Sequence, residues 1–330
     1  MRIIAPFLTA AAVALAVPAL AQTAPAPTAP AAPVSATPAT EAPRAQHLGP
    51  LVTPAELAAT DRAPLILDIR GADYAKGHIP GAVDAPYKLF RGPTDNPGRP
   101  VAPEQLQATL SQLGVELERP VVVVHQGSDQ DDFGAAARVY WTLKSAGVQD
   151  IAILNGGMNG WAAAGQPTET TPVTPEPSLI EITWDDRWTA TEAEVAAIAA
   201  GKGDAVLLDA RPPGFYEGRQ AHAAASVPGT VPGAENVPHT EWFAGSTPAI
   251  APAATAADVA RALGLNPERE IVTFCNTGHW AATEWFALSE LAGLPDVKMY
   301  PESMVGYTRG DHEIANRPGL VENLLRQIRG

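Results

Sequence analysis

The stretch "PLILDIRGADYAKGHIPGAVDAP", residues 64–86, decides the fold. An apolar run at 65–67 leads into Asp68, and glycine and proline punctuate the residues after it. Such a run is typical of a strand that is buried on both faces of a parallel sheet. The runs at 121–124 and 151–154 have the same character, and helical patterns separate them. Strands and helices that alternate at this spacing predict an α/β fold with a central parallel sheet.

The same layout occurs a second time along the chain. Its pieces are "AVLLDARPPGFYEG" (205–218), "VPGAENVP" (231–238), "EIVTFCNTGHW" (270–280) and "VKMYPESMVGYTRG" (297–310). We therefore predict two copies of one domain, at 47–168 and 181–330, joined by a linker at 169–180. In the second copy, Thr191, Thr255 and Thr283 are candidate N-caps or first-turn residues of helices, and Gly201, Gly264 and Gly293 are candidate C-caps.

The N-terminal segment has the pattern of a signal peptide at 1–21. Arg2 precedes an apolar stretch at 3–20, and Ala19-Leu20-Ala21 has the small-x-small pattern of a cleavage site. Residues 22–46 are rich in Pro and Ala, which predicts a disordered spacer. No later run approaches the ~18 apolar residues of a membrane-spanning helix. We expect a periplasmic protein without membrane insertion after signal cleavage.

Composition excludes several classes of function. The formal net charge of −14 argues against nucleic acid as a partner. The chain has one cysteine, so neither an internal disulfide nor a Cys-x-x-Cys redox motif is present. A Cys-x5-Arg phosphatase motif would need arginine at position 281, where Ala281 stands. No nucleotide-binding glycine motif occurs, and none of the seven histidines has the spacing of metal ligands, so we expect no metal and no organic cofactor.

The single cysteine lies where parallel sheets place reactive groups, beyond the carboxyl end of a strand. The run Ile271–Phe274 predicts that strand, and Cys275 is the first residue after it. Gly278 permits a tight turn that aims backbone N–H groups at the sulfur, and a helix from about residue 281 adds its positive end. Both effects favour the nucleophilic thiolate. The alternative is an inert buried thiol, since free cysteine packs like a small apolar residue.

Asp-x-Arg after a strand, "GHIPGA" and "NGGMNGW" together resemble a tandem-domain rhodanese-type sulfurtransferase of the thiosulfate or 3-mercaptopyruvate family. In such proteins only the C-terminal copy carries the cysteine, and here His125 stands at the matching position of the first copy. The resemblance implies that Cys275 takes a sulfane sulfur from a small anionic donor and passes it, as a persulfide, to a small-molecule or protein acceptor. The alternative is a sulfur carrier, sensor or partner-binding module that does not turn over.

The resemblance also suggests residues that contact the donor. They are Arg211, Asn276, Thr277, Gly278, His279 and Trp280, with Arg219 and Arg309 as further candidates. Arg211 is expected at the mouth of the pocket, or else in a structural pair with Asp209 or Glu217. Asn276 and Thr277 are candidate hydrogen-bond donors.

The remaining loop residues leave the donor open. His279 is a candidate proton donor or partial cation, or else a solvated loop residue, and Trp280 is a candidate pocket wall. The loop is neutral, whereas thiosulfate-using relatives have a cationic loop and mercaptopyruvate-using ones a Cys-Gly-Ser-Gly-like loop. For the first copy we expect structural or interface roles of Asp68, Arg70, His78 and His125.

Overall fold

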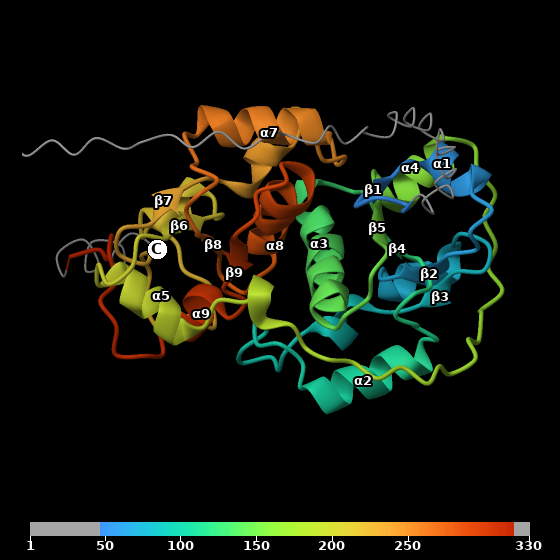
Figure 1. The fold of residues 1–330 in the computed structure, drawn as a ribbon, viewed down its shortest axis with the longest axis horizontal. Coiled ribbons are helices and arrows are strands. Elements are labelled where there is room, and N and C mark those ends of the chain that lie inside the picture. The colour runs from blue at the N-terminus through green and yellow to red at the C-terminus, as the bar shows by residue number, and fades with distance from the viewer. Residues whose placement is uncertain (1–46, 320–330) are drawn as a thin grey trace, which may run out of the picture. The chain divides into compact units, whose positions relative to one another are not determined.

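The computed structural model describes residues 47–319, so the predicted signal peptide and spacer lie outside the described residues. The first domain is built on a parallel sheet with the strand order β1-β5-β4-β2-β3 (Figure 1). Its strands are β1 (Leu51–Val52), β2 (Leu65–Asp68), β3 (Val83–Asp84), β4 (Val121–Val124) and β5 (Ile151–Leu154). The predicted apolar runs form its three central strands.

The second domain repeats this plan with the strand order β7-β6-β8-β9, again parallel throughout. Its strands are β6 (Val206–Asp209), β7 (Glu235–Asn236), β8 (Ile271–Phe274) and β9 (Val297–Met299). The central pair has the same register in both domains. Asp68 lies opposite Val124 in the first, and Asp209 lies opposite Phe274 in the second.

Helices cover both faces of each sheet. Those of the first domain are α1 (Pro54–Ala59), α2 (Pro103–Gln112), α3 (Gln130–Ser145) and α4 (Gly157–Ala163), with 3₁₀ turns η1 (Gly71–Lys76) and η2 (Tyr87–Phe90). The second domain has α5 (Glu192–Ala199), α6 (Pro213–Tyr216), α7 (Ala253–Ala262), α8 (Trp280–Trp285) and α9 (Ser303–Tyr307), the 3₁₀ turns η3 (Asp186–Trp188) and η4 (His239–Trp242), and the π-helical turn η5 (Phe286–Leu291) that continues α8. The prediction of two domains, each with a central parallel sheet flanked by helices, is confirmed.

The predicted helix caps are partly correct. Thr191 caps α5 in a reciprocal capping box with Glu194. Thr255 lies in the first turn of α7 instead, behind a Pro252 cap. Thr283 is not an N-cap, because α8 begins at Trp280; it is the fourth residue of that helix and is buried there. The three predicted C-cap glycines all have φ of +71°.

A shared apolar core joins the two domains. One buried cluster contains residues of both, including Leu106 of α2, Phe133 of α3 and Phe286 of η5. In Figure 1, α3 and α8 lie side by side between the two sheets. The Phe133 and Phe286 rings meet edge to face with their centroids 5.6 Å apart. Two further clusters cover the outer faces of the sheets. The helices that follow β4 and β8 thus begin at the domain interface.

In the described part of the chain, no helix has both the length and the apolar character needed to cross a lipid bilayer.

Candidate active site

Cys275 is the first residue after β8, and β8 lies between β6 and β9 in the sheet. Its side chain is 1 % exposed and forms no disulfide. The loop from Asn276 to His279 then turns tightly into α8, and Gly278 has φ of +66° in that turn. A Cβ atom at this glycine would collide with the Arg138 guanidinium and with the backbone of Pro301. Glycine is therefore needed both for the turn and for the close approach of its neighbours.

Ser303 brackets the cysteine loop from the next strand end. Its Oγ accepts hydrogen bonds from the amides of Cys275 (3.0 Å) and Gly278 (3.1 Å), and donates to the carbonyl of Tyr300 (2.8 Å). The same Oγ lies 4.0 Å from Cys275 Sγ. The Gly278 amide belongs to the turn that was expected to point N–H groups at the sulfur, but it binds this hydroxyl instead, because a hydroxyl oxygen accepts hydrogen bonds better than a thiol does. Ser303 was not predicted from the sequence.

Arg211 is buried and bound on all sides, with 2 % of its surface exposed. Its guanidinium forms two hydrogen bonds to the Asp209 carboxylate (2.8 and 2.6 Å) and one to the carbonyl of Gly229 (2.8 Å). Nη1 lies 3.3 Å from the side-chain oxygen of Asn276, next to the cysteine. The structure thus places Arg211 in a structural pair with Asp209, the alternative to a position at the pocket mouth.

The first domain repeats this arrangement without a cysteine to serve. Arg70 binds the Asp68 carboxylate (2.9 and 2.7 Å), the carbonyl of Gly77 (2.6 Å) and the side chain of Gln126 (3.2 Å). Gln126 follows His125 as Asn276 follows the cysteine. The domain without a cysteine keeps the contacts of this arginine with the carboxylate, the backbone carbonyl and the loop side chain. The Asp-x-Arg motif therefore serves the fold, because it fixes the loop after the central strand.

His279 lies at the domain interface. Its Nε2 donates to the carbonyl of Asp131 (2.7 Å), and Nδ1 accepts from the Tyr87 hydroxyl (3.0 Å). Burial and the nearby charge of Arg91 lower the pKa of His279 to about 4. The imidazole is therefore neutral at pH 7. This differs from the predicted role of proton donor or partial cation near the sulfur, and from the alternative of a solvated loop residue, because first-domain groups occupy both ring nitrogens.

Trp280 also contacts the first domain. Its indole N–H donates to the Asp131 carboxylate (3.0 Å), and its ring stacks on His239 with 5.1 Å between centroids. Nε2 of His239 bonds to the same carboxylate oxygen (2.8 Å). Trp280 thereby fixes the start of α8 against the first domain. The carboxylate that organises this contact was not predicted.

Two first-domain arginines hold consecutive carbonyls of the cysteine loop. Nη2 of Arg91 donates to the carbonyl of Thr277 (2.9 Å), and Nη1 of Arg138 donates to that of Gly278 (3.2 Å). Arg138 is fully buried in α3, and this burial together with the charge of Arg91 lowers its pKa to about 9. Neither arginine was predicted. The helical pattern "GAAARVYWTLKSAGV" has two charged residues, Arg138 and Lys144, and the place of Arg138 between apolar residues was the one signal for its role.

The two further candidates are surface residues paired with nearby acids. Arg219 binds the Glu217 carboxylate, and both side chains are about half exposed. Arg309 reaches Asp95 of the first domain, with 3.4 Å between Nη1 and the carboxylate. Within residues 47–319, neither residue forms a hydrogen bond or ion pair with the cysteine loop.

The sequence profile of the Rhodanese-like domain matches twice, at residues 53–164 and 191–309. The chain belongs to the rhodanese family of sulfurtransferases. It is 35 % identical over 260 residues to a thiosulfate sulfurtransferase of Pseudomonas aeruginosa and 33 % identical over 261 residues to one of Azotobacter vinelandii; each match covers 77 % of this chain and 92 % of the relative. It is 29 % identical over 248 residues to the sulfur carrier protein TtuD of Thermus thermophilus, covering 70 % of this chain and 82 % of that one.

The rhodanese fold is also seen in solved structures. The 3-mercaptopyruvate sulfotransferase SseA from Escherichia coli superposes with a TM-score of 0.66 at 24 % identity, covering 77 % of this chain and 98 % of that one. The two-domain rhodanese fold predicted from the repeat is confirmed.

In the first rhodanese domain an internal carboxylate occupies the loop that follows β4. One Asp132 oxygen accepts from the amides of Gly127 (2.5 Å) and Ser128 (3.3 Å) and lies 2.9 Å from Nδ1 of His125. The His125 interactions and these amides outweigh desolvation and lower the pKa of Asp132. The loop amides of the unarmed copy thus bind an anion that the chain itself supplies.

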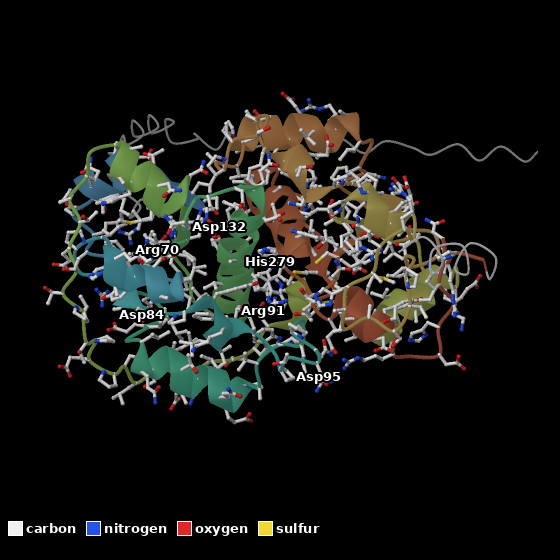
Figure 2. All side chains as sticks on the ribbon, turned by 180° about the vertical axis from the view of Figure 1, so that it is seen from behind. Arg70, Asp84, Arg91, Asp95, Asp132 and His279 are labelled. Atoms are coloured by element: carbon white, nitrogen blue, oxygen red, sulfur yellow. The ribbon has the colours of Figure 1, made fainter. Side chains whose placement is uncertain are left out.

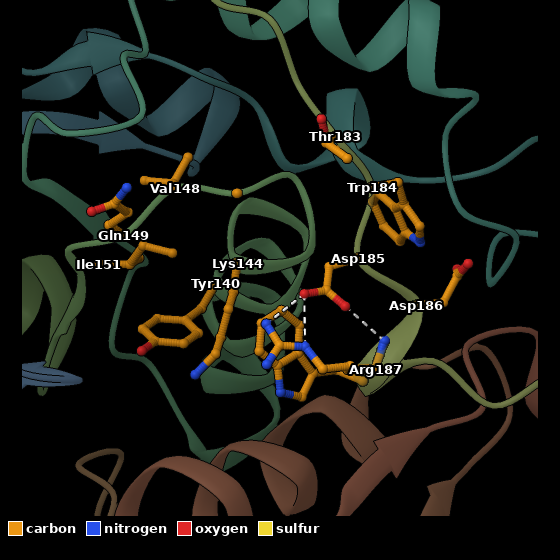
Figure 3. A pocket seen from close by; sticks show the side chains of 12 residues that line it. Tyr140, Lys144, Val148, Gln149, Ile151, Thr183, Trp184, Asp185, Asp186 and Arg187 are labelled. Atoms are coloured by element: carbon orange, nitrogen blue, oxygen red, sulfur yellow. Dashed lines mark hydrogen bonds and ion pairs between the residues drawn. The ribbon is translucent and has the colours of Figure 1, made fainter.

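A pocket of about 600 Å³ lies apart from these residues, between the C-terminal half of α3 and the segment 183–188 (Figure 3). Three of its charged side chains, those of Lys144, Asp185 and Arg187, are already paired. Arg187 binds Asp185, as the dashed lines in the figure show, and Lys144 binds Glu290. None of the predicted site residues lines it. Across the described residues, no group of three or more metal-ligating side chains gathers.

Proposed function

We propose that the protein moves a sulfane sulfur from a small anionic donor, thiosulfate or 3-mercaptopyruvate, to a nucleophilic acceptor through a persulfide on Cys275. One observation carries this proposal: the sole cysteine of a rhodanese chain lies at the carboxyl end of a central strand, in a loop held by Ser303 and by first-domain arginines. Relatives with about one third identity are named thiosulfate sulfurtransferases.

The reaction is a double displacement that needs no electron acceptor. The Cys275 thiolate attacks the outer sulfur of thiosulfate, the S–S bond of the donor breaks, and its electron pair leaves with sulfite. The enzyme then carries Cys–S–S⁻. A nucleophile such as cyanide or a thiolate attacks the terminal sulfur, and the bonding pair returns to Cys275 as thiolate.

Burial of the cysteine suits a carrier of reactive sulfur. With 1 % of its surface exposed, the thiol is screened from bulk solvent in this structure. A persulfide formed there is protected from stray thiols and oxidants. Small donors and acceptors fit this requirement better than bulky ones.

Mass spectrometry of the intact protein after exposure to each donor tests the proposal. We expect one added sulfur, removed again by cyanide with release of thiocyanate. Cys275→Ser should take up no sulfur while its melting temperature stays unchanged. Sulfur uptake by this variant, or none by the wild-type protein from either donor, would contradict the proposal.

A non-turnover carrier, sensor or partner-binding module is the second candidate. The similarity to the sulfur carrier protein TtuD favours it, and so does the buried position of the thiol. Steady-state assays with cyanide separate the two. An enzyme gives many thiocyanate molecules per cysteine, whereas a carrier stops after one unless a protein acceptor is supplied.

We also propose that the chain is exported to the periplasm after cleavage at the Ala19-Leu20-Ala21 pattern. Cell fractionation, together with the N-terminal sequence of the mature protein, tests this. A cytoplasmic protein that retains residues 1–21 would refute it.

A further inference from the structure

Arg91 reaches the cysteine loop from the first domain. It directly follows the turn η2, and its guanidinium lies over the ring of Tyr87, 5.2 Å from the centroid. Through Nη2 it holds the carbonyl of Thr277, two residues after the cysteine. Figure 2 shows Arg91 and His279 close together near the middle of the molecule. Arg91 therefore holds the loop that follows Cys275 from the side of the first domain.

The Arg91 guanidinium differs from the other candidate arginines in its partners. The three arginines predicted from the sequence are each paired with an acid, Arg211 with Asp209, Arg219 with Glu217 and Arg309 with Asp95. Within residues 47–319, by contrast, no carboxylate forms an ion pair with Arg91. Its Nη1 is buried and has no hydrogen-bond partner there. A buried N–H donor without an acceptor costs free energy, and an anion placed against it would recover that cost.

The charge of Arg91 is felt by its neighbours. It contributes to the lowered pKa values of Arg138 and His279, in both cases after desolvation. It likewise contributes, after desolvation, to the lowered pKa of His222, which lies on a second-domain loop. The Arg91 charge makes protonation of each of these three groups harder. An uncompensated positive potential therefore exists beside a loop that has no charge of its own.

We propose that Arg91 binds the anionic group of the sulfur donor, the sulfonate end of thiosulfate or the carboxylate of 3-mercaptopyruvate. This inference rests on the proposed function. Nη2 keeps its hold on the loop carbonyl, and Nη1 donates a charge-assisted hydrogen bond to the donor. The first domain thus supplies the cation that the cysteine loop lacks, and the catalytic domain alone forms an incomplete site.

Cysteine alkylation in the full chain tests this role independently of sulfur transfer. Anionic iodoacetate and neutral iodoacetamide attack the same thiol, so their rate ratio reports the local positive charge. We expect Arg91→Gln, which retains a donor for the loop carbonyl, to reduce the iodoacetate-to-iodoacetamide ratio about 10- to 100-fold. Arg91→Lys should restore much of the ratio.

A matched control is Arg99→Met. Arg99 lies on the same first-domain segment, with its side chain 57 % exposed and its guanidinium 3.8 Å from Glu302. This variant should leave the ratio unchanged. In donor assays, Arg91→Gln should raise KM for thiosulfate by a similar factor and change kcat much less.

Two results would overturn the inference. An unchanged ratio in a folded Arg91→Gln protein shows that the charge is not felt at the sulfur. Equal losses with both reagents, not restored by lysine, show that Arg91 only shapes the loop. If the wild-type protein takes up no sulfur but prefers iodoacetate in an Arg91-dependent way, the proposed function fails while the anion site stands.

Discussion

Ser303 and Gly157 occupy matching positions in the two domains, and both have left-handed backbones, with φ of +52° and +58°. In each domain the amide of the next residue binds the carbonyl at the end of the central strand, Met304 to Cys275 (3.1 Å) and Met158 to His125 (2.9 Å). The first domain has a glycine here, which fits this conformation, whereas the domain with Cys275 has a serine, which does not. The serine supplies a hydroxyl that binds two loop amides.

Ser303→Ala should therefore be the harsher of two substitutions. Alanine keeps the left-handed strain and leaves the Cys275 and Gly278 amides without their acceptor. We therefore expect the free energy of unfolding, measured in urea, to fall by at least about 2 kcal/mol. The loss of unfolding free energy in Ser303→Gly should be smaller than in Ser303→Ala by about 1 kcal/mol, because glycine relieves the strain. Sulfur transfer should fall in both variants. Thr247→Ala, at an exposed loop position, is the control. Equal stability of both variants and the wild type would contradict a stabilising role of the two hydrogen bonds that Ser303 accepts.

Arg211→Met should act on stability rather than on donor binding. It strands the buried Asp209 carboxylate, which predicts a loss of about 3–5 kcal/mol in the free energy of unfolding. Arg70→Met should lose a comparable amount, since its partner Asp68 is equally buried. Lysine should rescue neither site, because it cannot bind the carboxylate in two places. A raised KM for the donor in a fully folded Arg211→Met protein would instead return Arg211 to the donor site.

His279 makes the fold sensitive to mild acid. Its pKa is about 4 in the folded protein and lies near 6.5 when the chain unfolds, so between these values the unfolded state binds more protons. Stability should therefore decline as the pH falls from 6.5 to 4. Urea titrations should show a shallower decline for His279→Gln than for the wild type. His47→Gln, whose parent ring is 73 % exposed, should follow the wild-type curve. Parallel curves for all three proteins would contradict a neutral His279 held at the domain interface.

Glu284 should weaken the fold at alkaline pH. Its carboxyl is fully buried in α8, neither oxygen has a hydrogen-bond partner within residues 47–319, and desolvation raises its pKa well above the usual range. The folded state then holds a proton that the unfolded state has released, so stability falls as the pH rises above about 4.5. Glu284→Gln should be more stable than the wild type at pH 8, by about 1–3 kcal/mol, and nearly equal to it at pH 4.

A second acid provides the contrast to Glu284. Glu290 is bound by Lys144 and by the Tyr140 hydroxyl. Glu290→Gln should lower stability at pH 8, because it removes a paired charge. If Glu284→Gln loses as much as Glu290→Gln, then the Glu284 carboxyl is ionised and paired.

The position of Cys275 could be predicted because local pattern determines it. An apolar run marks the strand, a glycine marks the turn, and the repeat aligns Cys275 with His125. The residues that grip the loop could not be predicted in this way. Arg91 and Thr277 are 186 positions apart, and Arg138 and Gly278 are 140 apart, so only the packing of α3 against α8 brings them together. No periodicity or motif encodes such a contact.

Arg211 shows the opposite limit. Its motif was found, but a motif does not say whether the guanidinium faces a substrate or the protein. The first domain held the answer within the sequence, since Asp-x-Arg is retained at Asp68 and Arg70 in a copy that has no cysteine. Because the motif is present in a domain that has no cysteine, we infer that it stabilises the fold.

The Asp132 carboxylate in the first-domain loop would oppose a second cysteine site at position 125. Writing cysteine back at position 125 would place a thiolate against a carboxylate that already binds the Gly127 and Ser128 amides. Like charges at that distance would suppress ionisation of the thiol. A descendant would have to change His125 and Asp132 together, with no benefit from either step alone. The cysteine chemistry is therefore confined to the second of the two similar domains, and no single substitution at position 125 would extend it to the first.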